Sequence, residues 1–274
     1  MVEEERKFDV DARFSLPDLS AYVPVGGRVV TRPPVRLRAV YYDTDDLRLA
    51  RAGVSLRYRR GDDGAPWTVK LPTDVPGNRH EIDRTGDALR IPAELAALVT
   101  AYARGAPLGP AVTIRTTRVR HDLIDSDDRI LVEVADDRVA VIDGTQVATA
   151  FREIEVERKA GRRKLVRRVG SELVAAGARS GEFTAKHVRA LGEPARRPPD
   201  LVPPGTSPGR NASGAEVVTY ALRSDIGRIL AHDPLVRLRA PIGNGDTAVH
   251  QMRVGIRRLR ADLLTFKQIG RAHV

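Results

Sequence analysis

VEEERKFDV, residues 2–10, carries a charged residue at every second position of a candidate β-strand. Because side chains alternate along a strand, Glu3, Glu5 and Lys7 share one face and Phe8 points to the other. Two carboxylates and one ammonium group side by side form either a solvent-exposed face that binds nothing or a binding surface. The other strands of the chain decide between these interpretations.

Eight further segments alternate in polarity or are rich in β-branched residues, and turn residues bound them. These are residues 35–44, 53–61, 67–72, 79–84, 112–123, 129–137, 138–143 and 148–159. The candidate helices between and after them are residues 45–53, 91–105, 162–178 and 184–192. Eight or nine strands with few helices favour an antiparallel sandwich or barrel.

The composition narrows the possible partners. A net charge of +10 favours anionic ones, such as nucleic acid, anionic lipid or polyphosphate.

The chain has no cysteine, which excludes disulfides and thiolate metal sites. Its N-terminus is charged and no apolar run approaches the roughly 20 residues of a membrane span. We therefore expect a cytoplasmic protein without a membrane partner.

Residues 192–214 divide the chain, because they are rich in Pro, Gly and Ser and read as an extended linker. Residues 1–191 form the unit of strands before this linker. Residues 215–268 are helical, and residues 247–267 place apolar side chains three or four positions apart on one helix face.

Charges of one sign recur at every second position in several strand segments. The acidic set is Glu3, Glu5, Glu153, Glu155 and Glu157, and the basic set is Arg57, Arg59, Lys70, Arg118 and Arg120. Such neighbours lie about 7 Å apart, where like charges repel mildly. A solvated outer face explains one such strand, but repetition favours a divalent cation for the acids and a polyanion for the bases. A barrel with a charged interior would place both sets around one metal–polyphosphate complex.

Short motifs extend this pattern along the chain. EEERK (3–7) matches an E-x-E-x-K opening, and the motifs that follow in order are YYDT (41–44), GVSLRYR (53–59), WTVK (67–70), RHE (79–81), VEVADD (132–137), REIEVE (152–157) and TAKHVRAL (184–191). In this ordered set residues 1–191 resemble the CYTH family, the triphosphate tunnel metalloenzymes.

The resemblance implies an α+β fold, an eight-stranded antiparallel β-barrel that forms a tunnel and carries flanking helices. It implies hydrolysis of a triphosphate, most often inorganic triphosphate, with Mg²⁺ or Mn²⁺. The implied metal ligands are Glu3, Glu5, Glu153 and Glu155, with Glu157 and Glu133 as further ones. The implied triphosphate-binding residues are Arg57, Arg59, Lys70, Arg79, Arg118, Arg120 and Lys186. Lys70 and Lys7 are the candidate catalytic residues.

The C-terminal stretch VHQMRVGIRRLRADLLTF (249–266) resembles the first signature helix of the CHAD domain. That resemblance implies polyphosphate binding by a basic helix face, here His250, Arg253, Arg257 and Arg260. A solvated basic face is the alternative. A complete CHAD domain needs several more helices, so we expect residues 215–268 to be an incomplete one. One reading frame of a sequencing adapter encodes IGRAHV, and we expect residues 269–274 to be non-native.

Other functions stay open at this point. The same tunnel suits thiamine triphosphate or a nucleoside triphosphate, although one Trp and 4% aromatic residues offer little for base stacking. A non-catalytic polyphosphate-binding protein is a second alternative, which the four acidic residues at 3, 5, 153 and 155 disfavour. A nucleic-acid binder is the third, and no helix-turn-helix, zinc-finger or aromatic RNA-binding signature supports it.

Overall fold

The computed structural model describes residues 2–73, 78–180, 184–243 and 245–271. Its backbone contacts divide the chain into two compact units. The first comprises residues 1–92 and 108–196, and the second comprises residues 93–107 and 197–274.

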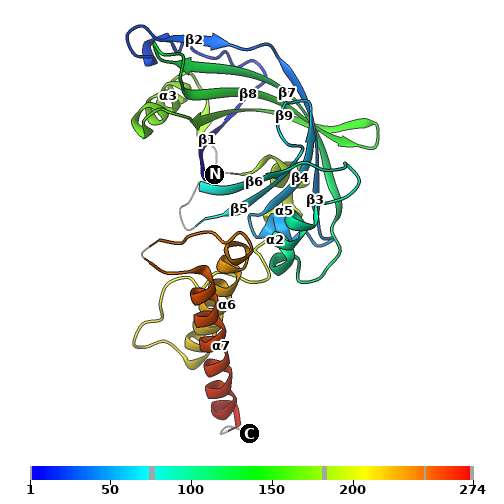
Figure 1. The fold of residues 1–274 in the computed structure, drawn as a ribbon, viewed down its shortest axis with the longest axis vertical. Helices are drawn as coiled ribbons and strands as arrows, with labels where there is room; N and C mark the ends of the chain where they lie inside the picture. Colours follow the sequence, from blue (N-terminus) through cyan, green and yellow to red (C-terminus); the bar gives the residue numbers. More distant parts are fainter. Residues whose placement is uncertain (1, 74–77, 181–183, 244, 272–274) are drawn as a thin grey trace. The chain divides into compact units, whose positions relative to one another are not determined.

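The first unit is built on an antiparallel sheet (Figure 1). Its strands are β1 (Val2–Val10), β2 (Arg28–Thr31), β3 (Val35–Asp43), β4 (Ser55–Arg60), β5 (Trp67–Pro72), β6 (Asn78–Arg84), β7 (Gly109–Ile124), β8 (Ile130–Asp143), β9 (Gln146–Arg158) and β10 (Arg179–Ser180). Its helices are η1 (Ser20–Tyr22), α1 (Arg48–Arg51), α3 (Arg163–Ala175), α4 (Lys186–Leu191) and α5 (Glu193–Arg196). This confirms the α+β class expected from the sequence.

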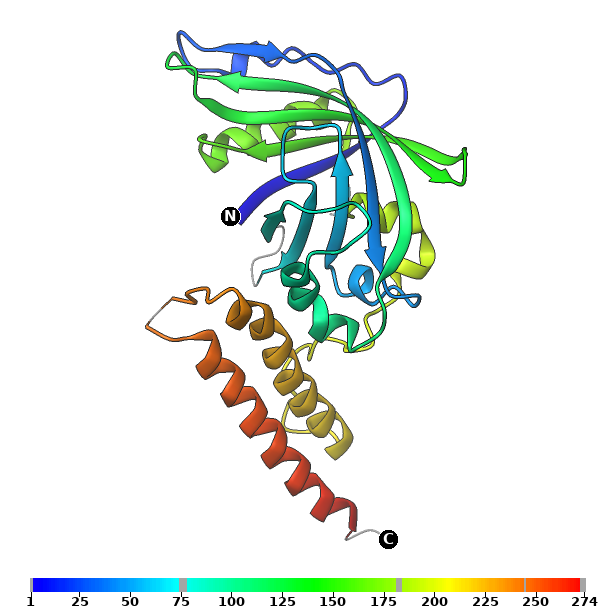
Figure 2. The same ribbon diagram turned by 45° about the vertical axis from the view of Figure 1, so that its right-hand side comes forward.

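Eight of these strands follow one another in the order β1-β6-β5-β4-β3-β7-β8-β9. Strand β1 pairs with β6 over Val2–Glu4 and with β9 over Glu5–Val10, so the order returns to its start. The β1–β6 pairing spans only three residues, and the term barrel therefore describes the sheet loosely. Figures 1 and 2 show how the long strands β7, β8 and β9 curve around the sheet's inner face.

An apolar cluster of the first unit lies on the outer face of the sheet, and a smaller one, with Ala39, Tyr41 and Ile114, lies on the inner face. Phe8, Ile154 and Val156 point outward from β1 and β9 and pack under Val169 and Leu173 of α3. The helix approaches β1 closely at Gly170, where an added Cβ would lie 2.8 Å from the ring of Phe8. Since alternate residues of a strand face opposite ways, apolar packing outside forces the charged residues inward.

The second unit contains three helices, α2 (Ala93–Ala103), α6 (Gly214–Arg237) and α7 (Ala248–Arg271). Helices α6 and α7 form a hairpin, and α2 packs against α6. A capping box at Ser213 and Glu216 starts α6. The apolar face of α7 is only partly covered, because Val249, Ile256 and Leu263 each remain about half exposed.

The structure departs from the expected elements at several places, and η1, β2 and β10 were not expected. Residues 129–143, expected as two strands, form the single strand β8, because Asp136 and Asp137 continue the alternation instead of forming a turn. Within the expected linker, residues 193–196 form α5. The helix at residues 93–103 groups with the C-terminal helices and not with the sheet. No helix among the described residues has the length and hydropathy of a membrane span.

Candidate active site

The inner face of the sheet encloses a cavity of about 630 Å³, called here the central cavity. Charged side chains from β1, from β4 to β9 and from α4 line it. These are Glu5, Lys7, Arg57, Arg59, Lys70, Arg79, Glu81, Arg118, Arg120, Glu133, Asp137, Glu155, Glu157 and Lys186. Segments far apart in sequence therefore bring acids and bases around one space.

Strand register explains why the acids gather on one wall. In the antiparallel pairing of β1 with β9, Glu5 lies opposite Glu157 and Lys7 lies opposite Glu155. In the pairing of β8 with β9, Glu133 lies opposite Glu157. Residues two positions apart on one strand share a face of the sheet, and the residue directly opposite on the next strand points to the same face. The glutamates of β1, β8 and β9 therefore gather on one face.

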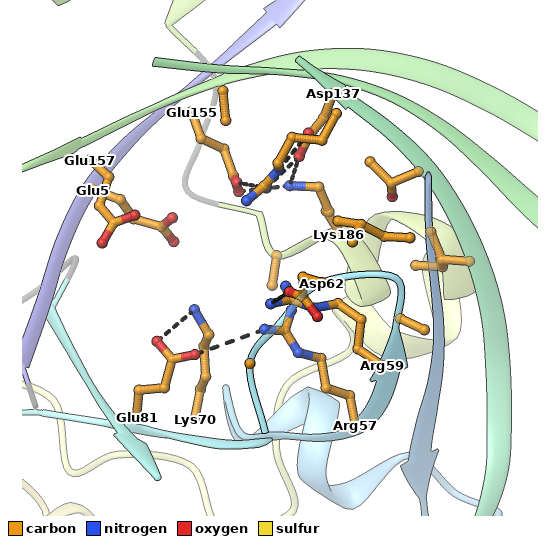
Figure 3. Close-up of a pocket in the computed structure, with 18 of the residues that line it drawn as sticks. Glu5, Arg57, Arg59, Asp62, Lys70, Glu81, Asp137, Glu155, Glu157 and Lys186 are labelled. Carbon is orange, nitrogen blue, oxygen red and sulfur yellow. Dashed lines mark hydrogen bonds and ion pairs between the residues drawn. The ribbon is translucent and has the colours of Figure 1, made fainter. Parts of the chain in front are cut away.

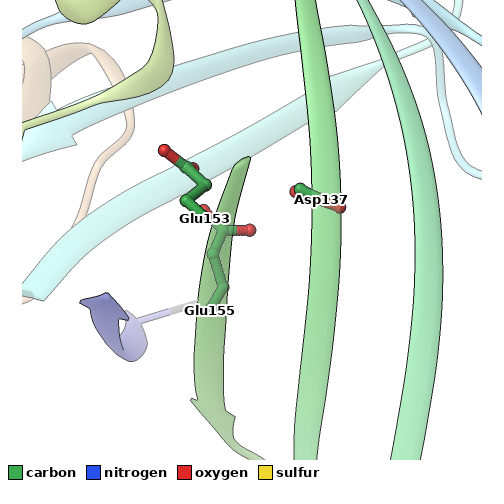
Figure 4. A group of neighbouring side chains, drawn as sticks. All are labelled: Asp137, Glu153 and Glu155. Atoms are coloured by element: carbon green, nitrogen blue, oxygen red, sulfur yellow. The ribbon is translucent and has the colours of Figure 1, made fainter. Parts of the chain in front are cut away.

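Three buried carboxylates form the tightest acidic group: Asp137 of β8 with Glu153 and Glu155 of β9 (Figure 4). One oxygen from each lies within 4.8 Å of the others. The ammonium nitrogen of Lys186 lies 2.8, 2.6 and 2.7 Å from Asp137, Glu153 and Glu155 respectively. The three side chains are therefore already arranged around one positive charge.

Two more cations approach Glu155, which is only 8% exposed. Arg118 Nη2 donates to Glu155 Oε2 at 2.6 Å and to Asp137 at 2.6 Å, and Lys7 forms an ion pair with Glu155. Burial alone would raise the pKa of Glu155, but the charges of Lys186 and Lys7 outweigh it and hold that pKa well below its usual range. The carboxylate is thus ionised and ready to hold a cation.

The geometry of Asp137, Glu153 and Glu155 suits a metal ion. Glu153 is 2% exposed, and its Oε1 atom has no hydrogen-bond partner in the described part of the chain, although Lys186 lies 2.6 Å away in poor hydrogen-bond geometry. An under-satisfied buried oxygen beside two other carboxylates is a donor set that suits a hard divalent cation. The residues present therefore fit the metal that the family resemblance implies.

The opposite wall of the central cavity is basic (Figure 3). Arg57 and Lys70 lie 3.8 and 3.3 Å from Glu81, and Arg59 pairs with Asp62. The Nε atom of Arg57 is buried without a hydrogen-bond partner among the described residues. These guanidinium and ammonium groups face the acidic wall across the cavity, and groups of this kind bind anionic oxygens.

An uncharged aromatic pair borders the cavity beside Lys186. The rings of His187 and Tyr41 stack at a centroid distance of 5.0 Å with 13° between their planes. Burial, followed by the nearby charges of Arg79 and Lys7, lowers the pKa of His187 to about 3. The imidazole is therefore neutral in the folded protein at neutral pH.

This depressed pKa predicts a pH dependence of stability. Since an unfolded histidine has a pKa of about 6.5, the unfolded chain binds a proton below that pH and the folded chain does not until about pH 3. Stability is therefore fully present above pH 6.5 and is lost as the pH falls. We expect the titration of His187 to lower the free energy of unfolding by about 1.5 kcal/mol as the pH falls from 6.5 to 5.

Urea unfolding of the wild type and of His187→Phe at pH 7, 6.5, 6, 5.5 and 5 measures this contribution. Phenylalanine keeps a ring against Tyr41 but does not titrate. The free energy of unfolding should fall less steeply with pH in the variant, whatever its absolute stability. Parallel curves for the two proteins would contradict the prediction.

Most of the site residues expected from the sequence line the central cavity. Glu153 instead lines a second cavity behind α4, while its carboxylate reaches the group of Asp137 and Glu155. The side chain of Glu3 lies outside the described residues. His250, Arg253, Arg257 and Arg260 belong to the second unit, and all four are exposed on α7.

The sequence interpretation missed three residues of this site. Asp137 shares a strand face with Glu133, four positions earlier, and Glu81 shares one with Arg79, two positions earlier. Their spacing was therefore a usable signal inside VEVADD and RHE. His187 gave no such signal, because only the packing of α4 brings it to Tyr41.

Comparison with known proteins follows the division seen in the fold. The CYTH domain profile matches residues 1–191, and the CHAD domain profile matches residues 220–273. Two uncharacterized proteins of Mycobacterium tuberculosis, MT2285 of strain CDC 1551 and Rv2226 of strain H37Rv, are each 33% identical over 290 residues. These matches cover 97% of this chain and 52% of each relative, so the chain spans about half the length of the curated relatives it matches.

Among solved structures, a proposed adenylate cyclase of Bacillus halodurans superimposes with a TM-score of 0.45 at 17% identity. The alignment covers 69% of this chain and 97% of that one. The domain profiles match the same residues that carry the charged cavity and the basic C-terminal helix. The chain therefore belongs to the CYTH family, and its CYTH domain is followed by a CHAD domain.

Proposed function

We propose that the central cavity binds a triphosphate together with divalent metal and hydrolyses it, with inorganic triphosphate as the expected substrate. One observation carries this proposal: a single cavity has an acidic wall of buried carboxylates facing a basic wall of guanidinium and ammonium groups. A phosphate chain bound to metal needs both walls at once. Membership of the CYTH family supports the same activity.

The acidic wall would hold the metal, Mg²⁺ or Mn²⁺. The proposed ligands are Glu5, Glu153 and Glu155, with Glu3, Glu133 and Glu157 as expected from the sequence and Asp137 added from the structure. Bound metal would neutralise phosphate charge and lower the pKa of a water molecule. Lys186 lies at the point where Asp137, Glu153 and Glu155 converge, so it competes with the metal for the same oxygens.

The basic wall would hold and orient the phosphates. The proposed residues are Arg57, Arg59 and Lys70 of that wall, together with Arg79, Arg118, Arg120 and Lys186. Arg118 and Lys186 contribute from the acidic wall, where they pair with Asp137 and Glu155. Phosphoryl transfer depends on positioning and charge neutralisation more than on covalent chemistry, which suits a site made of fixed charges. Lys7 and Lys70 stay the candidate catalytic residues, and both line the cavity, Lys7 beside Glu155 and Lys70 beside Glu81.

Phosphate release by the purified chain tests this function. The substrates are inorganic triphosphate, pyrophosphate, ATP and thiamine triphosphate, each with Mg²⁺, with Mn²⁺ or with EDTA. Preference for inorganic triphosphate with metal supports the proposal. Preference for ATP or thiamine triphosphate would keep the tunnel enzyme but replace its substrate, and no hydrolysis at all would favour a polyphosphate-binding protein.

We also propose that α7 binds inorganic polyphosphate through His250, Arg253, Arg257 and Arg260, in a protein of the cytoplasm. All four side chains are exposed on one helix of the CHAD domain. Each of the three arginines offers a planar group that matches phosphate oxygens.

Charge reversal on this helix gives the matching prediction. Arg253→Glu with Arg257→Glu should weaken polyphosphate binding at least about tenfold, since each charged contact contributes about 1.5–3 kcal/mol. Binding of a fluorescent polyphosphate chain measures the effect, and Arg38→Glu with Arg115→Glu, an exposed pair on β3 and β7, is the control. Equal losses in both proteins would mean that only overall charge matters.

A further inference from the structure

A second cavity, called here the α4 cavity, lies beside α4 and measures about 690 Å³. Residues of β1, α1, β6, β9, α4 and α5 line it. It shares Lys7, Arg79, Ala185 and His187 with the central cavity, so these four residues separate the two spaces. Its size falls within the range of small-ligand sites.

The charges around the α4 cavity are mostly positive. Five cations line it, namely Lys7, Arg51, Arg79, Arg189 and Arg196, against the two carboxylates of Asp9 and Glu153. Both carboxylates already have cationic neighbours: Arg189 pairs with Asp9, and Lys186 lies 2.6 Å from Glu153. Lys7 and Arg189 form ion pairs with Glu155 and Asp9, so the surplus positive charge of the cavity comes from Arg51, Arg79 and Arg196, and the space favours an anion.

Two features show how that anion would be held. Arg196 at the end of α5 is exposed and has no hydrogen-bond or ion-pair partner among the described residues, so its guanidinium is available. His187 is only 5% exposed, and its Nε2 atom is buried without a hydrogen-bond partner in the same part of the chain. An unpaired buried polar atom in the wall of a basic cavity indicates a missing polar ligand.

We propose that the α4 cavity is a second anion site, which binds orthophosphate or pyrophosphate separately from the central cavity. This inference rests on the proposed function, because hydrolysis of a triphosphate releases these two anions on the other side of the shared wall. Arg51 and Arg196 hold the anion from the outer side and Arg79 contacts it from the wall, while the Nε2 atom of the neutral His187 accepts a hydrogen bond from a protonated P–O–H group of the anion. Since Lys7 and Arg79 belong to both cavities, an anion in one weakens phosphate binding in the other.

Isothermal titration of the full chain with orthophosphate, and separately with pyrophosphate, tests the proposal without any need for catalysis. The wild type should show two binding events for at least one of these anions. Arg51→Ala with Arg196→Ala should weaken one event at least about tenfold. Arg57→Ala with Lys70→Ala should weaken the other event and should not weaken the first.

Two further variants protect the test from trivial results. Arg196→Glu changes an exposed side chain and should weaken the same event without affecting folding. Arg38→Ala with Arg115→Ala removes the same charge from an exposed, directly opposed pair on β3 and β7 and should leave both events unchanged. A single binding event in the wild type, or wild-type affinities in the Arg51 and Arg196 variants, would overturn the proposal. A chain that hydrolyses no triphosphate but still shows the second event would refute the proposed function alone.

Discussion

Glutamine in place of Glu155 is expected to lower the rate of triphosphate hydrolysis at least about a hundredfold. Glu155 is one of three buried carboxylates whose oxygens lie within 4.8 Å of one another. Glutamine has about the same size as glutamate but carries no charge. The loss weakens the hold on a divalent cation, which supplies several kcal/mol of charge stabilisation in such reactions. Phosphate release from inorganic triphosphate, measured from zero to saturating Mg²⁺ or Mn²⁺, gives the size of the effect.

Stability needs to be followed in the same experiment. Glu155 also pairs with Lys7, Lys186 and Arg118, and breaking a buried ion pair costs about 3–5 kcal/mol of stability. Thermal unfolding therefore accompanies the kinetics, which are measured well below the transition. Glu193→Gln makes the same chemical change at an exposed position of α5 and should retain full activity.

The wild type in EDTA provides a test that is independent of folding. Its activity should fall as far as that of Glu155→Gln and should return when metal is added. Full activity in EDTA, or in folded Glu155→Gln protein, would show that the acidic wall does not hold a catalytic metal.

Alanine in place of Arg57 is expected to lower kcat/KM for triphosphate about 10- to 100-fold. Arg57 points into the central cavity from β4, and its Nε atom has no hydrogen-bond partner among the described residues. A hydrogen bond to a charged group contributes about 1.5–3 kcal/mol, and the loss of one or two such bonds to a phosphate gives this range. Lys70→Ala removes a single point charge from the neighbouring strand and should have a similar or smaller effect.

Arg38→Ala is the matched control for Arg57→Ala. Arg38 lies on β3, the strand that pairs with β4, but its side chain is exposed on the outer face. Its replacement removes the same charge without touching the cavity, and kcat/KM should stay within about twofold. Equal losses from Arg38→Ala and Arg57→Ala would indicate a diffuse basic surface instead of a defined phosphate site.

Alternation along the strands made much of this site predictable. Glu5 and Lys7, Arg57 and Arg59, Arg118 and Arg120, and Glu155 and Glu157 each lie two positions apart, and all eight residues line one cavity. Adjacent apolar residues, such as Phe8 after Lys7 and Val156 between Glu155 and Glu157, are buried on the opposite face. A period of two is a local property of the backbone, so it can be read from residues that lie next to each other in the chain.

The partners of these charges were not predictable in the same way. Lys186 meets Asp137, Glu153 and Glu155 only because α4 packs against the end of the sheet, far from those strands in sequence. His187 is neutral only because the same packing buries it beside Arg79 and Lys7. Burial and ion pairing depend on contacts between distant segments, and no local pattern encodes them.

The chain's order of residues was thus enough to establish which side chains face inward, which face the apolar exterior and where the helical part begins. It did not establish which carboxylates converge, which cation neutralises them or that a second basic cavity lies behind α4. The face of the sheet to which a side chain points is decided by the backbone geometry of neighbouring residues. Convergence is decided by the pairing of β8 with β9 and by the docking of α4, which act over many tens of residues and exist only once the sheet has formed.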